Sequence, residues 1–139
     1  SAIDEGAKLV TGGPDLPPNV NRGYYIQPTV FSNVTPDMRI AKEEIFGPVV
    51  TLIAYDSLEQ AIDMANDTEY GLSAAISGDP AKAAEVAPQL RAGMVAINNW
   101  GPTPGAPFGG YKQSGNGREG GLAGLKDFME MKAISGLPA

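Results

Sequence analysis

Glu44 and Phe46, two residues apart near the end of a predicted helix, form the pattern in this sequence best suited to hold a ligand. They stand in the stretch EEIFGP (residues 43–48), where a Gly-Pro turn leads into a predicted buried strand. A carboxylate there can accept hydrogen bonds from both hydroxyls of a ribose, and the ring offers a flat apolar face to a heteroaromatic group. The alternative is a solvated pair of glutamates beside a phenylalanine of the core.

A second candidate is the pattern G-x-G-x-x-G at residues 115–120, which matches the dinucleotide-binding fingerprint. That fingerprint needs a strand directly before it, whereas residues 109–114 (GGYKQS) are typical of a loop. We therefore expect these glycines to let the loop turn tightly and approach the next helix closely. Arg118 and Glu119, at the start of that helix, are interpreted as a helix cap plus an ion pair, with a functional role as the alternative.

A third candidate follows the predicted strand at residues 94–98. Ligands of parallel α/β sheets bind beyond the carboxyl ends of strands, which is where Asn98, Asn99 and Trp100 stand. Trp100 and Phe108 could then line a pocket for an organic substrate. A loop held on the core by its own aromatic side chains is an equally good interpretation.

The elements that position these residues alternate along the chain. Strand, helix, strand, helix and strand with short links predict parallel strands with right-handed crossovers. The predicted fold class is therefore α/β, a layered parallel sheet with flanking helices. We predict strands at residues 8–13, 24–31, 49–55, 73–77 and 94–98, and helices at residues 36–44, 58–65, 80–90 and 122–131.

Several boundaries carry local signals. Residues 35–37 (TPD) are typical of a helix start, and Ser57 with Gln60 forms a capping box. Pro28 restricts the strand at residues 24–31 to a sheet edge or a bulge. One face of the last helix should point inward, with Leu122, Leu125 and either Phe128 or Met129.

Composition limits the function classes. A length of 139 residues suits a single domain (residues 1–139) with a buried core, and the absence of Cys and His excludes thiolate nucleophiles and predicts no metal site. A net charge of -6 argues against nucleic acid or an anionic membrane as partner, and no stretch reaches the roughly 18 apolar residues of a spanning helix. No signal peptide is visible, which favours a cytoplasmic protein. The chain starts on what resembles the end of an amphipathic helix, which suggests a piece of a longer protein.

Five stretches taken together resemble the aldehyde dehydrogenase superfamily over almost the full length of the chain. They are GYYIQPTVF (23–31), IAKEEIFGPVV (40–50), ANDTEYGLSAAI (65–76), LRAGMVAIN (90–98) and PFGGYKQSGNGRE (107–119). Enzymes of this family oxidise aldehydes to acids with NAD or NADP. A cysteine thiolate attacks the aldehyde, hydride passes to the nicotinamide, and a water activated by a glutamate hydrolyses the thioester.

The resemblance implies roles for particular residues. Glu44 would hold the hydroxyls of the nicotinamide ribose, and Phe46 would pack near the nicotinamide. Phe108 would lie near the aldehyde pocket, Trp100 in a loop that varies with substrate, and Glu119 would have a supporting role. The segment 132–139 resembles a strand that joins an oligomerisation sheet, which implies a homo-oligomer.

In the family, the nucleophilic cysteine, the general-base glutamate, the oxyanion-hole asparagine and the dinucleotide domain all lie upstream of the part that this chain resembles. The chain alone is therefore predicted to be inactive, to need the rest of an aldehyde dehydrogenase chain and an aldehyde substrate, and to expose apolar surface that the missing part would cover. One alternative is a non-catalytic module for assembly or nucleotide binding. An independent enzyme using Glu43 and Glu44 is disfavoured, because adjacent carboxylates on a helix point about 100° apart.

Overall fold

The computed structural model describes residues 1–99, 101 and 103–136, and the chain divides into two compact units, Ser1–Met64 and Ala65–Ala139. Each unit is described by itself. The single domain expected from the sequence stays a prediction.

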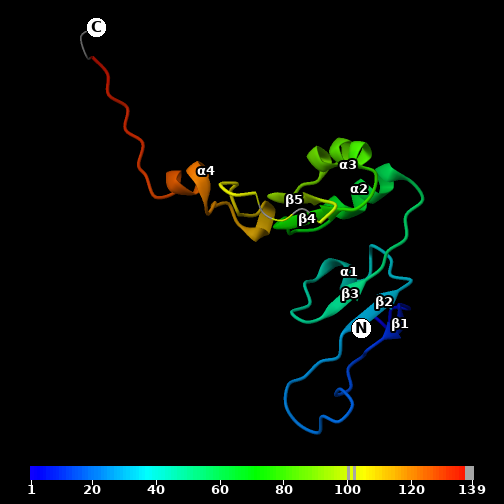
Figure 1. Ribbon diagram of the computed structural model, residues 1–139. Coiled ribbons are helices and arrows are strands. Elements are labelled where there is room, and N and C mark those ends of the chain that lie inside the picture. Colours follow the sequence, from blue (N-terminus) through cyan, green and yellow to red (C-terminus); the bar gives the residue numbers. More distant parts are fainter. Residues whose placement is uncertain (100, 102, 137–139) are drawn as a thin grey trace. The chain divides into compact units, whose positions relative to one another are not determined.

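The first unit contains a three-stranded sheet with the order β1-β2-β3 (Figure 1). Its strands are β1 (Lys8–Thr11), β2 (Thr29–Ser32) and β3 (Val49–Thr51). The strand β1 runs antiparallel to β2, and β3 runs parallel to it. The predicted strand at residues 24–31 begins only at Thr29, because Pro28 has no N–H to donate to a ladder. Of the two alternatives predicted from Pro28, the sheet edge is wrong, since β2 is the central strand. The irregularity in its pairing with β1 lies on the β1 side, between Leu9 and Thr11.

The helix α1 (Arg39–Lys42) is shorter than the predicted helix at residues 36–44. Thr35 does not cap it, because its hydroxyl donates to the carboxylate of Asp37 instead. The first N–H of the helix, that of Arg39, donates to the Glu5 carboxylate over 2.7 Å. The cap therefore comes from a residue distant in sequence, which a local start signal cannot reveal.

The helix α2 (Leu58–Asn66) begins at the predicted capping box. Ser57 Oγ accepts from the N–H of Gln60 over 3.2 Å, as a capping box requires. The Gln60 side chain accepts from the N–H of Asp56 rather than from that of Ser57. The first half of the box is thus confirmed, and its second half is shifted by one residue.

The second unit contains a two-stranded parallel sheet of β4 (Ser73–Ile76) and β5 (Met94–Ile97) (Figure 1). The helix α3 (Pro80–Val86) and the 3-10 helix η1 (Ala87–Gln89) connect these two strands. The chain thus contains parallel strands and flanking helices, and the predicted α/β class is confirmed. The predicted strand at residues 49–55 is confirmed only over its first three residues, and it lies in the other sheet.

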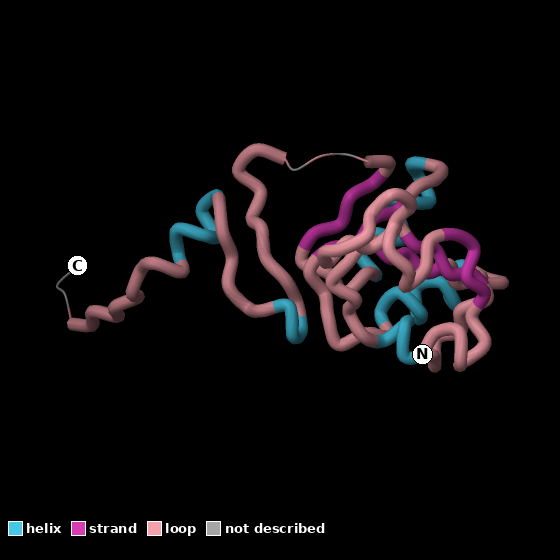
Figure 2. The backbone as a smooth tube through the Cα atoms, turned by 90° about the horizontal axis from the view of Figure 1, so that it is seen from below, coloured by secondary structure: helices cyan, strands magenta, loops and turns pink. Residues whose placement is uncertain are grey.

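The C-terminal part departs most from the sequence prediction. Loops and turns make up most of the chain after β5, interrupted by η2 (Lys112–Ser114) and α4 (Gly121–Lys126) (Figure 2). The predicted helix at residues 122–131 ends at Lys126, and its supposedly inward side chains are exposed: Leu122, Leu125, Phe128 and Met129. Residues 132–136 form no strand, and residues 137–139 lie outside the described part. An oligomerisation strand there stays a prediction, since such a strand needs a second chain to pair with.

The buried core is smaller than the sequence predicts. In the first unit it consists of Ala2, Ala7, Val34 and Met38, with partly buried neighbours around them. In the second unit it consists of Ala83 and Val86. The helices and strands of each unit are too short and too few to bury one another's apolar side chains, so many large apolar residues stay exposed. No helix among residues 1–99, 101 and 103–136 is long and apolar enough to cross a membrane.

Candidate functional site

The turn that carries Glu44 and Phe46 is fixed at both of its ends. Before it, the N–H of Glu43 donates to the carbonyl of Arg39 and closes α1. After it, the Pro48 carbonyl accepts from the N–H of Thr29 over 2.8 Å, directly before β3 pairs with β2. Two tight turns lie between these ends, and both involve Gly47. Its N–H donates to the Ile45 carbonyl, and its carbonyl accepts from the N–H of Val49.

The two adjacent glutamates differ in their partners. Glu43 accepts from Arg39 Nε over 2.8 Å, across one turn of helix. That hydrogen bond lowers the pKa of Glu43 and raises the pKa of Arg39. No hydrogen bond or ion pair engages Glu44 among the residues that the structure describes. Of the two, Glu44 therefore has the carboxylate that is available to an incoming ligand.

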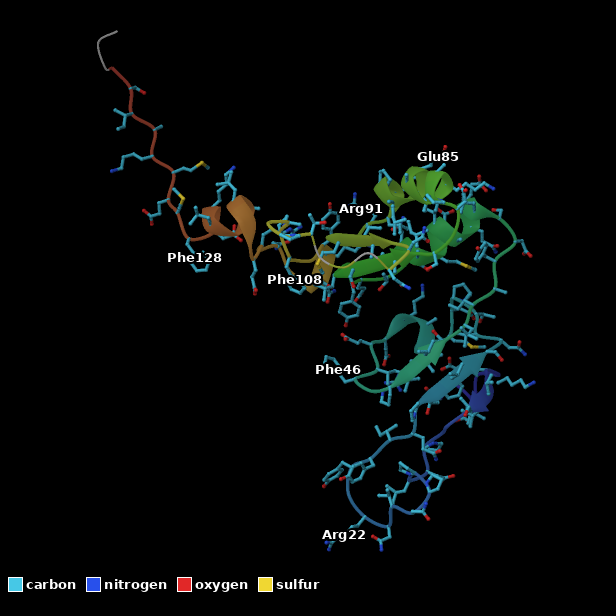
Figure 3. All side chains as sticks on the ribbon, in the orientation of Figure 1. Arg22, Phe46, Glu85, Arg91, Phe108 and Phe128 are labelled. Atoms are coloured by element: carbon cyan, nitrogen blue, oxygen red, sulfur yellow. The ribbon has the colours of Figure 1, made fainter. Side chains whose placement is uncertain are left out.

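A cavity of about 400 Å³ adjoins this turn and includes both glutamates in its wall. The rest of its wall is mostly apolar. It includes Phe31 from β2 and Val49 from β3. Phe46 does not line the cavity, and its ring is 91% exposed. Figure 3 shows the Phe46 side chain projecting away from the ribbon at the turn between α1 and β3. The alternative interpretation of Phe46 as a core residue is therefore wrong.

In the second unit, the structure brings Phe108 and Glu119 together. Each donates its N–H to the carbonyl of the other, over 2.8 Å and 2.7 Å, as an isolated antiparallel bridge. Directly opposed residues of an antiparallel pair present their side chains on the same face. Both line a second cavity of about 330 Å³, together with Leu72 and the exposed Phe128.

Arg118 holds the loop around this bridge, a role that the sequence analysis missed. Its Nη1 donates to the carbonyls of Gly110 over 2.9 Å and Gly117 over 2.8 Å. Its guanidinium also lies 5.6 Å from the centre of the Tyr111 ring. The predicted ion pair is wrong, because among the described residues Arg118 is engaged with backbone carbonyls instead. The predicted cap is also wrong, since Gly120 occupies the N-cap of α4 without a side-chain bond.

The segment around η2 is anchored to the chain before β4. Lys112 Nζ donates to the carbonyls of Asn66 and Thr68 over 2.7 Å and 2.9 Å. Ser114 Oγ accepts from the N–H of Gly71 over 3.0 Å, and the Gly71 carbonyl accepts from the N–H of Tyr111 over 2.8 Å. The glycine-rich loop is thus positioned by contacts between residues at least forty positions apart in sequence, which a local pattern does not reveal.

Two of the remaining candidates have structural explanations. The side chain of Asn98 bonds both the N–H and the carbonyl of Gly78, which ties the end of β5 to the turn after β4. The glycines at residues 115–120 follow η2 rather than a strand, so the context of a dinucleotide fingerprint is missing. Their predicted use as turn residues is supported by φ values of 110° at Gly115 and 76° at Gly120. Trp100 lies outside the described residues.

Metal chemistry finds no support in the described residues, where no group of three or more acidic, Cys or His side chains could hold an ion. The candidate residues are thus described as two groups, one in each unit. Glu44 and Phe46 share one turn of the first unit, whereas Phe108 and Glu119 share one bridge of the second.

The chain matches the aldehyde dehydrogenase family over residues 1–134. An aldehyde dehydrogenase structure from Bartonella henselae superposes with a TM-score of 0.92 at 54% identity, covering 97% of this chain and 29% of that one. A Cys-to-Ala mutant of aldehyde dehydrogenase C from Pseudomonas syringae, in complex with NAD+ and octanal, superposes with a TM-score of 0.91 at 54% identity, covering 96% of this chain and 28% of that one.

A curated relative from Staphylococcus haemolyticus is 51% identical over 135 residues, which cover 96% of this chain. Those residues are 28% of the relative, so the chain spans little more than a quarter of the length of the curated proteins that it matches.

Proposed function

This chain belongs to the aldehyde dehydrogenase family, and from that premise we propose that it is the C-terminal part of an oxidoreductase that oxidises an aldehyde to a carboxylic acid with NAD or NADP. The observation that carries the proposal is the turn at Glu44 and Phe46, where an unengaged carboxylate and an exposed ring stand beside a partly apolar cavity.

The residues of this turn fit the ribose and nicotinamide half of such a cofactor. The Glu44 carboxylate has the acceptor capacity to bind both hydroxyls of a ribose. The exposed face of Phe46 can pack against a planar ring. When bound, the nicotinamide supplies the chemistry of hydride acceptance, and the work of Glu44 and Phe46 is to orient it. Neither side chain takes part in bond making or breaking.

In the second unit, the substrate side of the proposal rests on Phe108 and Glu119. The Phe108 ring would form part of the wall that receives the aldehyde, with Trp100 nearby in sequence. Glu119 stands opposite Phe108 in their bridge, and its carboxylate would support proton movement near the same wall. Arg118 acts on both through the loop backbone, which makes it a positioning residue.

The chain by itself has no nucleophile for this reaction, because it contains no cysteine. We therefore expect the isolated chain to be inactive, and the remaining part of an aldehyde dehydrogenase to be its first partner. The many exposed apolar side chains support this expectation and also a homo-oligomer, since surface of this kind is normally covered by other protein.

A fusion protein tests the proposal. It consists of the Pseudomonas syringae enzyme with its matching C-terminal segment replaced by this chain, which the 54% identity makes compatible. We expect the fusion protein to form NADH from NAD+ and octanal at a rate within roughly tenfold of the unaltered enzyme, because a mismatch of contacts across the join misplaces the site only slightly. The unaltered enzyme is the matched control.

A fusion protein that folds, binds NAD+ and forms no NADH would contradict the proposed activity. That result would favour a module for assembly or nucleotide binding instead. Folding is checked independently of activity by the cooperativity of thermal unfolding.

A further inference from the structure

We propose that Asn116 is a site of spontaneous covalent modification, at which the side-chain amide is lost and the backbone is rerouted through the side chain. The chain has seven asparagines, and Asn116 is the only one that precedes a glycine. Because Gly117 has no Cβ, its backbone nitrogen can approach the side chain of the preceding residue without steric hindrance. The water of the solvent is the only co-reactant that the modification needs.

The backbone nitrogen of Gly117, which must attack, donates no hydrogen bond to any of the described residues. The next N–H along the chain, that of Arg118, donates to Asp127 Oδ2 over 2.6 Å. Among the described residues, no hydrogen bond engages the N–H of Gly117 or the side-chain amide of Asn116. Asn116 is also exposed to solvent. The two groups that must react are therefore not held apart by competing contacts.

The Arg118 guanidinium favours the first chemical step. Its Nη1 lies 3.4 Å from the carbonyl oxygen of Asn116, which belongs to the same peptide unit as the Gly117 nitrogen. When that nitrogen loses its proton, the negative charge spreads onto this carbonyl oxygen. A cation beside the oxygen stabilises the charge and so makes the N–H more acidic.

The reaction balances without an oxidant or reductant. Hydroxide removes the proton of the Gly117 nitrogen, whose electron pair then forms a bond to Cγ of Asn116. The bond from Cγ to Nδ2 breaks, and the nitrogen leaves as ammonia after taking a proton from water. Water then opens the five-membered imide at one of its two carbonyls, which gives either aspartate or isoaspartate at residue 116.

Two other asparagines, Asn66 and Asn98, are protected by their contacts. The Asn66 side chain donates to the carbonyl of Gln89 over 2.9 Å and accepts from the N–H of Arg91 over 2.7 Å. Asn98 forms a similar pair of bonds with Gly78. Their amides are therefore held in place, and each precedes a residue with a side chain. Both serve as controls within the same molecule.

The modification would change the loop that positions the bridge. Isoaspartate adds a methylene to the backbone between residues 116 and 117 and places a new carboxylate there. Arg118 binds the carbonyls on both sides of that linkage, at Asn116 and Gly117. Its contacts must shift, and the pairing of Phe108 with Glu119 should loosen with them.

Ageing of the purified full chain at mildly alkaline pH tests the proposal. Trypsin cuts after Lys112 and Arg118, so Asn116 lies alone in the peptide of residues 113–118. We expect this peptide to gain about 1 Da before those that contain Asn66 or Asn98. Labelling by an isoaspartate methyltransferase should rise in parallel, and the amide hydrogens of Phe108 and Glu119 should exchange faster in the aged chain.

Gly117→Ala is the decisive variant. A Cβ at residue 117 would lie 3.4 Å from Asp127 Oδ2, an ordinary contact, and the backbone there is outside the left-handed region. The fold should accept it, while the added methyl group hinders the attack and slows conversion roughly tenfold. An Asn116 that stays amidated in buffer while the urea-unfolded chain converts would overturn the proposal, as would equal rates in Gly117→Ala and the unaltered chain.

Discussion

Replacing Gly93 with alanine should lower the free energy of unfolding of the chain by roughly 3 kcal/mol or more. A Cβ at residue 93 would lie 1.7 Å from the carbonyl oxygen of Gly109 and 3.1 Å from Cα of Gly110. These are backbone atoms, which cannot rotate away as a side chain does. The segment next to Phe108 would have to move, so the bridge between Phe108 and Glu119 should loosen as well. Urea unfolding of the chain measures the first effect, and amide hydrogen exchange at Phe108 measures the second.

Gly101→Ala is the matched control for this prediction. None of the described residues has a heavy atom within 4 Å of a Cβ at residue 101, and Gly101 lies eight residues further along the same unit. We expect its unfolding free energy to change by less than about 0.5 kcal/mol. A Gly93→Ala chain as stable as the Gly101→Ala chain would show that the close approach of residues 93 and 109 does not support the unit.

In the fusion protein, Glu44→Gln should lower kcat/KM for NAD+ by about ten- to a hundredfold, which corresponds to the 1.5–3 kcal/mol typical of a hydrogen bond to a charged group. The glutamine keeps the size of the side chain but replaces one acceptor oxygen with a donor and removes the charge. It can therefore no longer accept from both hydroxyls of a ribose. Steady-state NADH formation at varied NAD+ concentration gives the effect on KM and kcat separately.

Glu43→Gln is the control, because it makes the same chemical change one residue away. Glu43 is bonded to Arg39 on an exposed helix surface, and the loss of such a pair has little effect. We expect its kcat/KM to stay within about twofold of the unaltered fusion protein. Equal losses in both variants would indicate a general effect of charge, and a larger loss in Glu43→Gln would mean that the wrong glutamate was assigned.

The sequence predicts an element well when the residues that set its boundary stand next to that boundary. The helix predicted from residue 80 does begin there: Asp79 caps α3, with its carboxylate accepting from the N–H of Lys82 over 3.0 Å, and Pro80 occupies the first turn. The start of α2 after Ser57 follows in the same way. In each case the determining residue stands next to the boundary that it sets.

The sequence fails where the determining contact is distant. The start of α1 depends on Glu5, more than thirty residues earlier in the chain. Gly93 follows the second crossover helix, and its lack of a side chain allows the backbone of Gly109 to approach closely. The last helix is shorter than its apolar pattern predicts. The side chains of that pattern, such as Leu122 and Phe128, find no partner surface in this chain and stay exposed.

The candidate site shows the same division. The resemblance indicates Glu44, Phe46, Phe108 and Glu119, and the structure places the last two in one bridge. The anchoring roles of Arg118 and Lys112 were missed, because a positively charged side chain that binds backbone carbonyls has no sequence signature. A glycine-rich segment as long as residues 101–121 is often a functional loop, and it needs contacts with other segments to hold it in place.

The rate of NADH formation by the isolated, purified chain with NAD+ and an aldehyde tests the central claim most directly. We propose that Glu44 and Phe46 position the cofactor, and a chain without cysteine has no nucleophile for the reaction. We therefore expect a rate equal to that of a blank without protein, at any chain concentration. Turnover that rises in proportion to the amount of chain, and that persists through further purification, would contradict it.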